Sequence, residues 1–225
     1  MTSLASRRSG GRAARRDARA NPLADALRPV RPGLDGGLYQ PLTEMQMRRI
    51  HEAALDALEQ IGLADAPPSG IAYMTGAGAI LGSDGRLRFP RALIEDTIAR
   101  AGRTITLHGR DPRHDLTLSG NRVHYGTAGA AVHLVDVTTG EYRDSTVQDL
   151  HDAARIADTL DNIHFVQRPM VCRDIADNYE MDINTLYACC AGTTKHVGVS
   201  FSDPTHVAGC FDLIHLIAGG EEAWR

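Results

Sequence analysis

The sequence predicts an α/β fold in which a small α+β region precedes a series of strand–helix units. From residue 122 onward, short strand-like runs alternate with longer helical ones. This unit then repeats, which favours parallel βαβ connections and either an α/β barrel or a doubly wound sheet. The expected strands lie near residues 122–126, 163–167 and 196–200, and the expected helices span residues 146–160, 178–191 and 204–218.

Residues 1–42 are predicted to form a disordered Arg-rich arm and a Pro/Gly-rich linker, and residues 43–121 the small α+β region. The first helix of that region begins at Thr43, which forms a capping-box pattern with Gln46, and it ends before Gly62. The other expected elements are a weaker helix over residues 66–74, strands at 80–81 and 86–89 around a turn at 82–85, a helix from 90 to about 101, and strands at 104–108 and 116–118.

Residues 122–225 are predicted to form the first βα units. Their first strand runs into Gly126-Thr127-Ala128-Gly129, where two glycines permit a sharp turn or a close approach to a ligand. A hairpin follows over residues 131–144, and Thr146 then opens a helix with Asp149 where a capping box usually has Glu or Gln. The later elements are a strand at 162–167, a helix at 177–191, a strand at 195–201 and a helix at 204–218.

No expected strand follows Gly220, and three βα units cannot close an eight-stranded barrel. We therefore expect a fragment of a longer gene product, or a chain whose open sheet edge needs a partner. An unpaired edge and an exposed apolar helix face would make the isolated chain self-associate, for example as a homo-oligomer.

The charge is divided unevenly along the chain. Residues 1–20 carry six arginines and one aspartate, a formal charge of +5, so the chain's total of −4 leaves −9 for the remainder. An acidic body is unsuited to coating a nucleic acid. The basic arm is expected to be disordered; the alternative is an arm that touches a partner, RNA or the acidic surface of the body. No run of 18 apolar residues indicates a membrane span.

The four cysteines show neither CxxC spacing nor a Cys/His zinc pattern. We expect buried, reduced thiols, which fits a cytoplasmic protein, and we expect no metal site. The less favoured alternative is that one of them is a ligand of a metal or a corrin. These cysteines are Cys172, Cys189, Cys190 and Cys210.

Two short blocks have the composition of functional motifs. Residues 126–129 are interpreted either as a tight turn or as the wall of a ligand site. The block Thr193-Thr194-Lys195-His196 contains the only lysine of the chain. Because it lies at the entrance of an expected strand, the end of a barrel strand that usually serves stability, we favour a structural role for Lys195, such as an internal ion pair.

The expected carboxyl ends of the second and third strands hold further polar side chains, where a barrel site would be built. These residues are Gln167, Arg168, Cys172, Arg173 and Asp174, then Ser200, Phe201, Ser202 and Asp203. Asp203, which precedes Pro204, is expected to cap a helix. Tyr125, Phe165 and Phe201 are expected to pack in the core; alternatively, one or two of them form the wall of a site for a cationic ligand.

Several sequence blocks follow one another in a characteristic order: Tyr125 to Ala131, Asp136 to Glu141, Thr146 with Asp149-Leu150, Asp161 to Val166, and Thr193 to His196. The order of these blocks resembles the trimethylamine methyltransferase family, over nearly the whole chain. The Arg-rich arm and the helix behind it are also similar to the start of that family.

The resemblance implies the N-terminal half of a TIM-type (β/α) barrel with N-terminal additions, from a bacterial member without pyrrolysine. It implies transfer of a methyl group from a tertiary or quaternary amine to a Co(I) corrinoid protein, with no cofactor bound directly and the corrinoid supplied by that partner. It gives no catalytic residue. The residues we expect to bind the methylated amine are Tyr125, Gly126, Thr127, Gly129, Arg168 and Phe201.

Two other functions compete with this expectation. One is a non-catalytic binding or scaffold module derived from the barrel, and the other is a different barrel enzyme such as a lyase. To test the proposed mouth, we expect Gly129→Val to impair turnover more than folding, since a β-branched side chain would intrude where the backbone nears the ligand.

Overall fold

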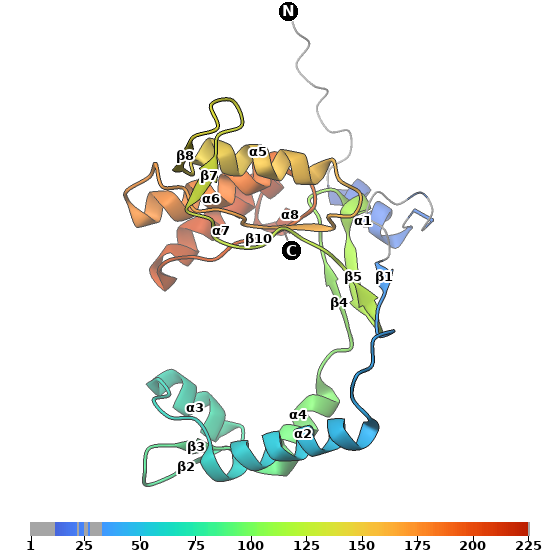
Figure 1. Cartoon of the computed structure of the whole chain (residues 1–225), viewed down its shortest axis with the longest axis vertical. Coiled ribbons are helices and arrows are strands. Elements are labelled where there is room, and N and C mark those ends of the chain that lie inside the picture. Colours follow the sequence, from blue (N-terminus) through green and yellow to red (C-terminus); the bar gives the residue numbers. More distant parts are fainter. Residues whose placement is uncertain (1–11, 22, 25–26, 28–32, 225) are drawn as a thin grey trace, which may run out of the picture. The chain divides into compact units, whose positions relative to one another are not determined.

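The structure is a computed structural model that describes residues 12–21, 23–24, 27 and 33–224. The chain divides into two compact units (Figure 1). One unit is residues 37–103, and the other joins residues up to 36 with those from 104 onward. These two units are compact, but compactness alone does not show that a segment folds independently. The predicted division into residues 1–42, 43–121 and 122–225 therefore stays a prediction.

The unit of residues 37–103 follows the expected order of elements. It contains α2 (Glu44–Asp56), a π-helical turn (Ala57–Ile61), α3 (Pro68–Gly76), β2 (Ile80–Leu81), β3 (Leu87–Arg88) and α4 (Arg91–Arg100). The predicted capping box at α2 is confirmed, because Thr43 and Gln46 each bind the other's backbone N–H through a side-chain oxygen. Its core consists of Ala79, Leu87 and Phe89, against which Leu58, Ile71 and Ile94 pack.

The second unit combines antiparallel pairs with a parallel series. Its antiparallel pairs are β1 (Leu34–Asp35) with β6 (Arg122–Val123), β4 (Thr104–Leu107) with β5 (Leu116–Ser119), and β7 (His133–Val135) with β8 (Tyr142–Asp144). The parallel series contains α5 (Val147–Asp158), β9 (Phe165–Gln167), α6 (Asn178–Gly192), β10 (His196–Gly198) and α7 (Val207–Ala218). Short helices complete it: α1 (Arg12–Ala20), 3₁₀ turns at Pro112–His114 and Pro204–His206, and α8 (Glu221–Trp224).

The parallel pairing predicted for the second and third strands is confirmed: β9 and β10 are parallel, with Phe165 opposite His196 and Gln167 opposite Gly198. The first expected strand is divided. Its start, β6, pairs antiparallel with β1, and only Gly126 reaches β9, in a parallel bridge with Phe165. These segments form no closed barrel within the described residues, so the partial TIM-type barrel stays a prediction.

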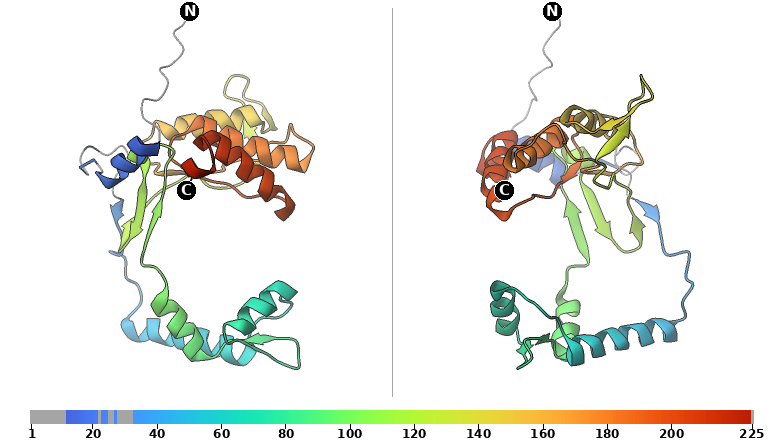
Figure 2. Two further views of the ribbon diagram at one scale, coloured as in Figure 1. Left: turned by 180° about the vertical axis from the view of Figure 1, so that it is seen from behind. Right: turned by 60° about the vertical axis from the view of Figure 1, so that its left-hand side comes forward.

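Strand alternation gives this parallel layer two different faces. Val166 packs with Ala154 and Ala157 of α5, and Val197 contacts the clusters around α6. Because successive side chains of a strand point to opposite faces, Phe165 and Gln167 face away from these helices. Helices α5, α6 and α7 lie side by side over the first face (Figures 1 and 2).

The expectation of disorder is wrong for residues 12–20, which form helix α1. Arginine and alanine favour helices, and side chains of α1 bind the body of the same unit. The guanidinium of Arg19 lies 2.9 Å from the carboxylate of Asp115, and Arg15 donates to the backbone oxygen of Ala218. The alternative in which the arm touches the acidic body therefore holds for this helix, while residues 1–11 lie outside the described part.

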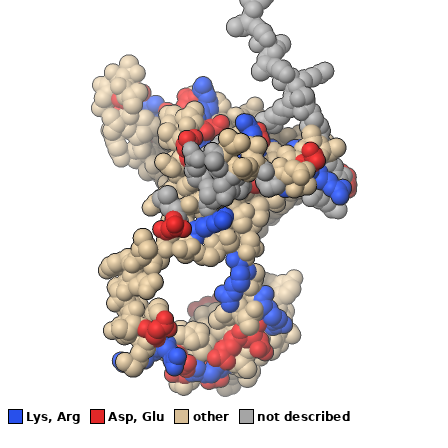
Figure 3. All heavy atoms as spheres, turned by 90° about the vertical axis from the view of Figure 1, so that its right-hand side faces the viewer, with Lys and Arg blue, Asp and Glu red and all other residues tan. Residues whose placement is uncertain are grey.

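The face of the molecule drawn in Figure 3 shows mixed charge rather than a basic patch. On this face, acidic and basic side chains are interspersed. In the described part of the chain, no helix is both long enough and apolar enough to cross a membrane.

Candidate active site at the ends of the parallel segments

Hydrogen bonds join the carboxyl ends of the three parallel segments into one edge. The hydroxyl of Thr127 donates to the backbone oxygen of Gln167 at 2.5 Å. The N–H of Arg168 donates to the backbone oxygen of Gly198 at 3.0 Å. Three βα loops therefore start side by side, which is the arrangement that carries sites in parallel α/β folds.

Two glycines on this edge are required by their neighbours. A side chain at Gly126 would overlap the ring of Phe165, and one at Gly198 would overlap the amide of Gln167. The larger side chains of β9 therefore lie across the glycines of the adjacent segments. Gly126 was expected to contact a ligand. In the structure, the absence of a side chain at Gly126 makes room for the ring of Phe165.

Gly129 has a φ of +119°, a conformation that L-residues rarely adopt. A Cβ there would lie 3.6 Å from the backbone oxygen of Pro169, so space does not forbid a side chain. Gly129→Val would thus strain the backbone and reduce the stability of the fold. The structure therefore does not support the expectation that this substitution impairs turnover more than folding. Thr127 is a better probe of this loop.

The loop after Gly129 is fixed by a buried serine. The hydroxyl of Ser145 lies 3.1 Å from the backbone oxygen of Ala131 and 2.7 Å from that of Val171. The predicted capping box beside it is confirmed, since Thr146 and Asp149 each bind the other's backbone N–H. The first loop of the edge is therefore tied both to the next loop and to the start of α5.

The other expected ligand residues do not share one environment. The side chain of Tyr125 is 54% exposed, whereas Phe201 packs against the buried cluster of Leu186, Cys190 and Cys210. The charge of Arg168 acts on the thiols of Cys172 and Cys189, which belong to the cluster on the helix face. Phe201 therefore follows the core-packing interpretation.

The expectation of buried thiols is confirmed, because all four cysteines are free and buried. Burial raises the pKa of Cys189 to about 12 and also raises the pKa of Cys172, Cys190 and Cys210. These thiols are therefore kept protonated and unreactive.

A polar cluster beside the third loop was only partly visible in the sequence. One oxygen of the buried Asp182 accepts hydrogen bonds from the N–H and hydroxyl of Ser202 and lies 2.7 Å from Nδ1 of His206. Burial alone would raise the pKa of Asp182, but the bonds from His206 and Ser202 lower it below its ordinary value. Asp203 caps the next turn, as predicted. The cluster fixes the third loop on α6.

At the opposite ends of the strands, Lys195 is buried and its ammonium group donates to three backbone oxygens. The distances are 2.7 Å to Ala157, 2.7 Å to Leu160 and 2.6 Å to Ile163. A structural role was expected, but the acceptors are backbone carbonyls of the last turn of α5 and of the segment that follows it, rather than a carboxylate. A cation near a helix carboxyl end is stabilised by the helix dipole and by the backbone carbonyls that gather there.

Two histidines that no sequence pattern singled out lie just before the bridged residues Gly126 and Phe165 in the chain. The rings of His124 and His164 meet edge to face at 5.0 Å, and Nδ1 of His164 accepts the N–H of Tyr125 at 2.9 Å. Nδ1 of His124 and Nε2 of His164 are buried and have no hydrogen-bond partner in the described part of the chain. Burial lowers the pKa of both residues.

We expect this pair to make the protein sensitive to mild acid. Because the folded pKa of each lies below the unfolded value of 6.5, the unfolded chain binds protons first, and stability falls as pH drops through this value. His124→Gln should flatten the fall of the urea midpoint between pH 7 and 5, whereas His51→Gln, at an exposed position on α2, should not. Equal pH profiles for the two variants would contradict this assignment.

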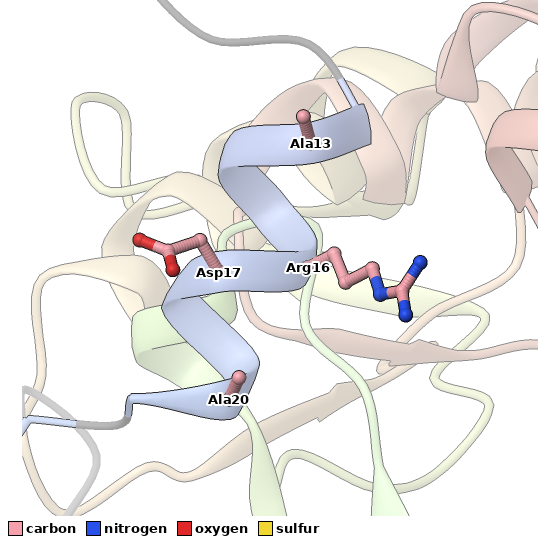
Figure 4. A pocket seen from close by; sticks show the side chains of 4 residues that line it. All are labelled: Ala13, Arg16, Asp17 and Ala20. Atoms are coloured by element: carbon pink, nitrogen blue, oxygen red, sulfur yellow. The ribbon is translucent and has the colours of Figure 1, made fainter.

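Two other features do not make a site. A shallow hollow is lined by Ala13, Arg16, Asp17 and Ala20, all from α1, and the charged side chains of Arg16 and Asp17 point apart (Figure 4). Within residues 33–224 and the described parts of the arm, no three His, Cys, Asp or Glu side chains gather as a metal site. The edge formed by Thr127, Gln167 and Gly198 is the better candidate.

The comparisons with known proteins agree on one family. A family model described as trimethylamine methyltransferase (MTTB) matches residues 8–224. The chain is 28% identical to the trimethylamine methyltransferase MttB of Desulfitobacterium hafniense (strain DSM 10664 / DCB-2), covering 81% of this chain and 37% of that protein. It is 24% identical to the trimethylamine methyltransferase MttB of Methanosarcina thermophila, covering 84% and 40%.

A further relative carries a different substrate in its name. The chain is 24% identical to a glycine betaine methyltransferase of Desulfitobacterium hafniense (strain Y51), covering 82% of this chain and 38% of that protein. The chain therefore spans about two fifths of the length of these relatives.

Proposed function

This chain belongs to the trimethylamine methyltransferase family, and we propose that the complete gene product transfers a methyl group from a tertiary or quaternary amine to a reduced corrinoid protein. The family match over residues 8–224 carries the proposal. Relatives named for trimethylamine and for glycine betaine support an amine as the methyl donor. Buried free thiols are consistent with the cytoplasm as its location.

The chemistry sets three requirements for the site. A neutral amine is a poor methyl donor because its leaving group is too basic, whereas a quaternary or protonated nitrogen departs as a neutral amine. The site must therefore admit a cation, exclude water and align the methyl group with its acceptor. The corrinoid cobalt is that acceptor and supplies the electron pair that takes the methyl group; it is carried by a partner protein.

We assign the donor's position to the edge formed by Thr127, Gln167 and Gly198. Thr127 fixes the first loop on the second, and the amide of Gln167 lies over Gly198 on the face turned away from the helices. Tyr125, with its exposed ring, is the aromatic residue beside this edge that is free to contact a cation. These residues would position the amine and do no acid–base chemistry, since the amine leaves without needing a further proton.

The direct test is methyl transfer by the complete gene product. The protein is mixed with trimethylamine or glycine betaine and with cob(I)alamin or a corrinoid protein, and the demethylated amine and the methylated corrinoid are both measured. Stoichiometric formation of the two products supports the proposal. Failure with tertiary and quaternary amines and both acceptors would overturn it and favour a binding module.

Thr127→Val is expected to lower kcat/KM about tenfold, because the lost hydrogen bond to Gln167 loosens the edge by about 1–1.5 kcal/mol. The control is Thr97→Val, which removes a similar bond, at 2.7 Å, to the carbonyl of Leu93 in α4. Turnover and melting temperature are measured for both variants. If turnover is unchanged in both variants, Thr127 is not part of the site.

A further inference from the structure

The hairpin of β7 and β8 has one face anchored to the body. Leu134 lies opposite Arg143, and the guanidinium of Arg143 binds both oxygens of Asp149 at 2.7 and 2.9 Å. The same guanidinium reaches Asp136 at 3.0 Å. Because Asp149 also caps α5, this face is held by a bidentate ion pair at the start of that helix.

The opposite face of the hairpin carries exposed apolar and aromatic side chains. Val135 lies opposite Tyr142, and the two side chains are 58% and 73% exposed. The ring of His133 stacks on that of Tyr142 at 5.0 Å and binds Asp144 at 3.0 Å. Val137, at the tip, is fully exposed. The hairpin thus presents a preorganised surface, defined here as the hairpin face: His133, Val135, Val137 and Tyr142.

This face emerges beside the candidate active site. The hairpin is part of the first loop of the edge, and its base is bridged to the second loop through Ala131 and Met170. Figures 1 and 2 show the hairpin projecting away from α5 in each view. A molecule that brings a methyl acceptor to this edge must pass close to the hairpin.

We propose that the hairpin face is the docking surface for the corrinoid-carrying partner, an inference that rests on the proposed function. A methyl acceptor held by a protein has to seat on the edge that holds the amine, and Tyr142 and Val137 offer the rigid aromatic and aliphatic contacts that interfaces favour. The partner must leave after each transfer, and small interfaces suit such short-lived complexes.

The size of the surface argues against a second copy of this chain as the occupant. Val135, Val137 and Tyr142 together offer apolar area on the order of a few hundred Å². A stable dimer needs about 1,200–2,000 Å² of total buried surface, so this face alone would not hold one. A brief encounter with the methyl acceptor fits this area better.

Accessibility is tested first, in the complete gene product with a Val137→Cys variant. The four cysteines of this chain are buried, so a charged thiol reagent should label the new thiol far faster than these four. We expect labelling in the free protein and at least tenfold slower labelling when the corrinoid protein is in excess. A thiol that is already inaccessible without the partner, or that the partner does not protect, would overturn the proposal.

Kinetics then separate docking from chemistry. Tyr142→Ala should raise the KM for the corrinoid protein about tenfold, and it should leave methyl transfer to free cob(I)alamin unchanged. Tyr73→Ala, at an exposed position in α3, should change neither value. An unaltered KM for the corrinoid protein would refute the docking surface while leaving the reaction intact. Absence of transfer from the unmutated protein to either acceptor would instead refute the proposed function.

Sedimentation provides the last arm of the test. The complete protein and its Val137→Asp variant should show the same oligomeric state, because the hairpin face is assigned to the corrinoid partner. An oligomer that dissociates on this substitution would show that the face binds a second copy, and it would overturn the proposal.

Discussion

Replacing Lys195 with methionine is expected to lower the free energy of unfolding by about 3–5 kcal/mol, one of the two largest effects we predict. The ammonium group has three N–H donors, and each of them meets a backbone oxygen of the last turn of α5 or of the segment that follows it. Methionine has a similar length but no donor. The carbonyls of Ala157, Leu160 and Ile163 would therefore lose a partner in a site where Lys195 itself is only 2% exposed.

The test compares two cations of the same region. Arg155 lies on α5, is 65% exposed and pairs with Asp152, so Arg155→Met should cost less than about 0.5 kcal/mol. Urea unfolding gives the two free energies, and hydrogen exchange at the end of α5 shows whether the loss is local. A Lys195→Met protein as stable as Arg155→Met would show that the three carbonyls find other partners.

The features of the fold that were predictable from the sequence are mostly local. The two capping boxes depend on residues three positions apart, and the Asp203 cap on residues two positions apart. The parallel pairing of β9 and β10 was predictable because a strand, a helix and a strand in this order have few alternative arrangements. Each of these predictions needs no knowledge of a distant contact.

The features that escaped prediction depend on distant contacts. The acceptors of Lys195 are 32 to 38 residues away in the chain, and Arg19 reaches Asp115 across 96 residues. His124 and His164 were passed over because isolated histidines carry no spacing pattern. Helix α1 was assigned to disorder on composition alone, because the carboxylate of Asp115 could not be placed beside it.

In the candidate site, too, local features were predictable from the sequence and distant contacts were not. The sequence indicated the edge through the glycines at 126 and 129, since glycine is used where a backbone turns or approaches another group. It did not show that Phe165 fills the space beside Gly126, because the strand phases were open. For Phe201 it left two interpretations, core packing and the wall of a cation site, and the structure supports core packing. The face on which each side chain lies is set by the pairing of Phe165 with Gly126 and His196.

Gly126→Ala is expected to reduce methyl transfer by about 100-fold, since displacement at a reacting centre by about 1 Å has effects of this size. The added methyl group would overlap three atoms of the Phe165 ring, so the ring or the first segment must shift. The same overlap should cost about 1–3 kcal/mol of stability. Gly102→Ala is the control, because no atom beyond its own chain neighbours lies within 4 Å of the position that its added methyl group would take.

A second substitution decides whether the overlap with Phe165 is the cause. Phe165→Leu in the Gly126→Ala protein removes the ring atoms that meet the new methyl group, so it should restore part of both stability and turnover. The free energies of the single and double variants form a cycle, and an interaction of about 1 kcal/mol or more is expected for two groups in contact. Additive losses would mean that Gly126 is needed for its backbone conformation or for the ligand itself, and that the Phe165 ring does not set the shape of the edge.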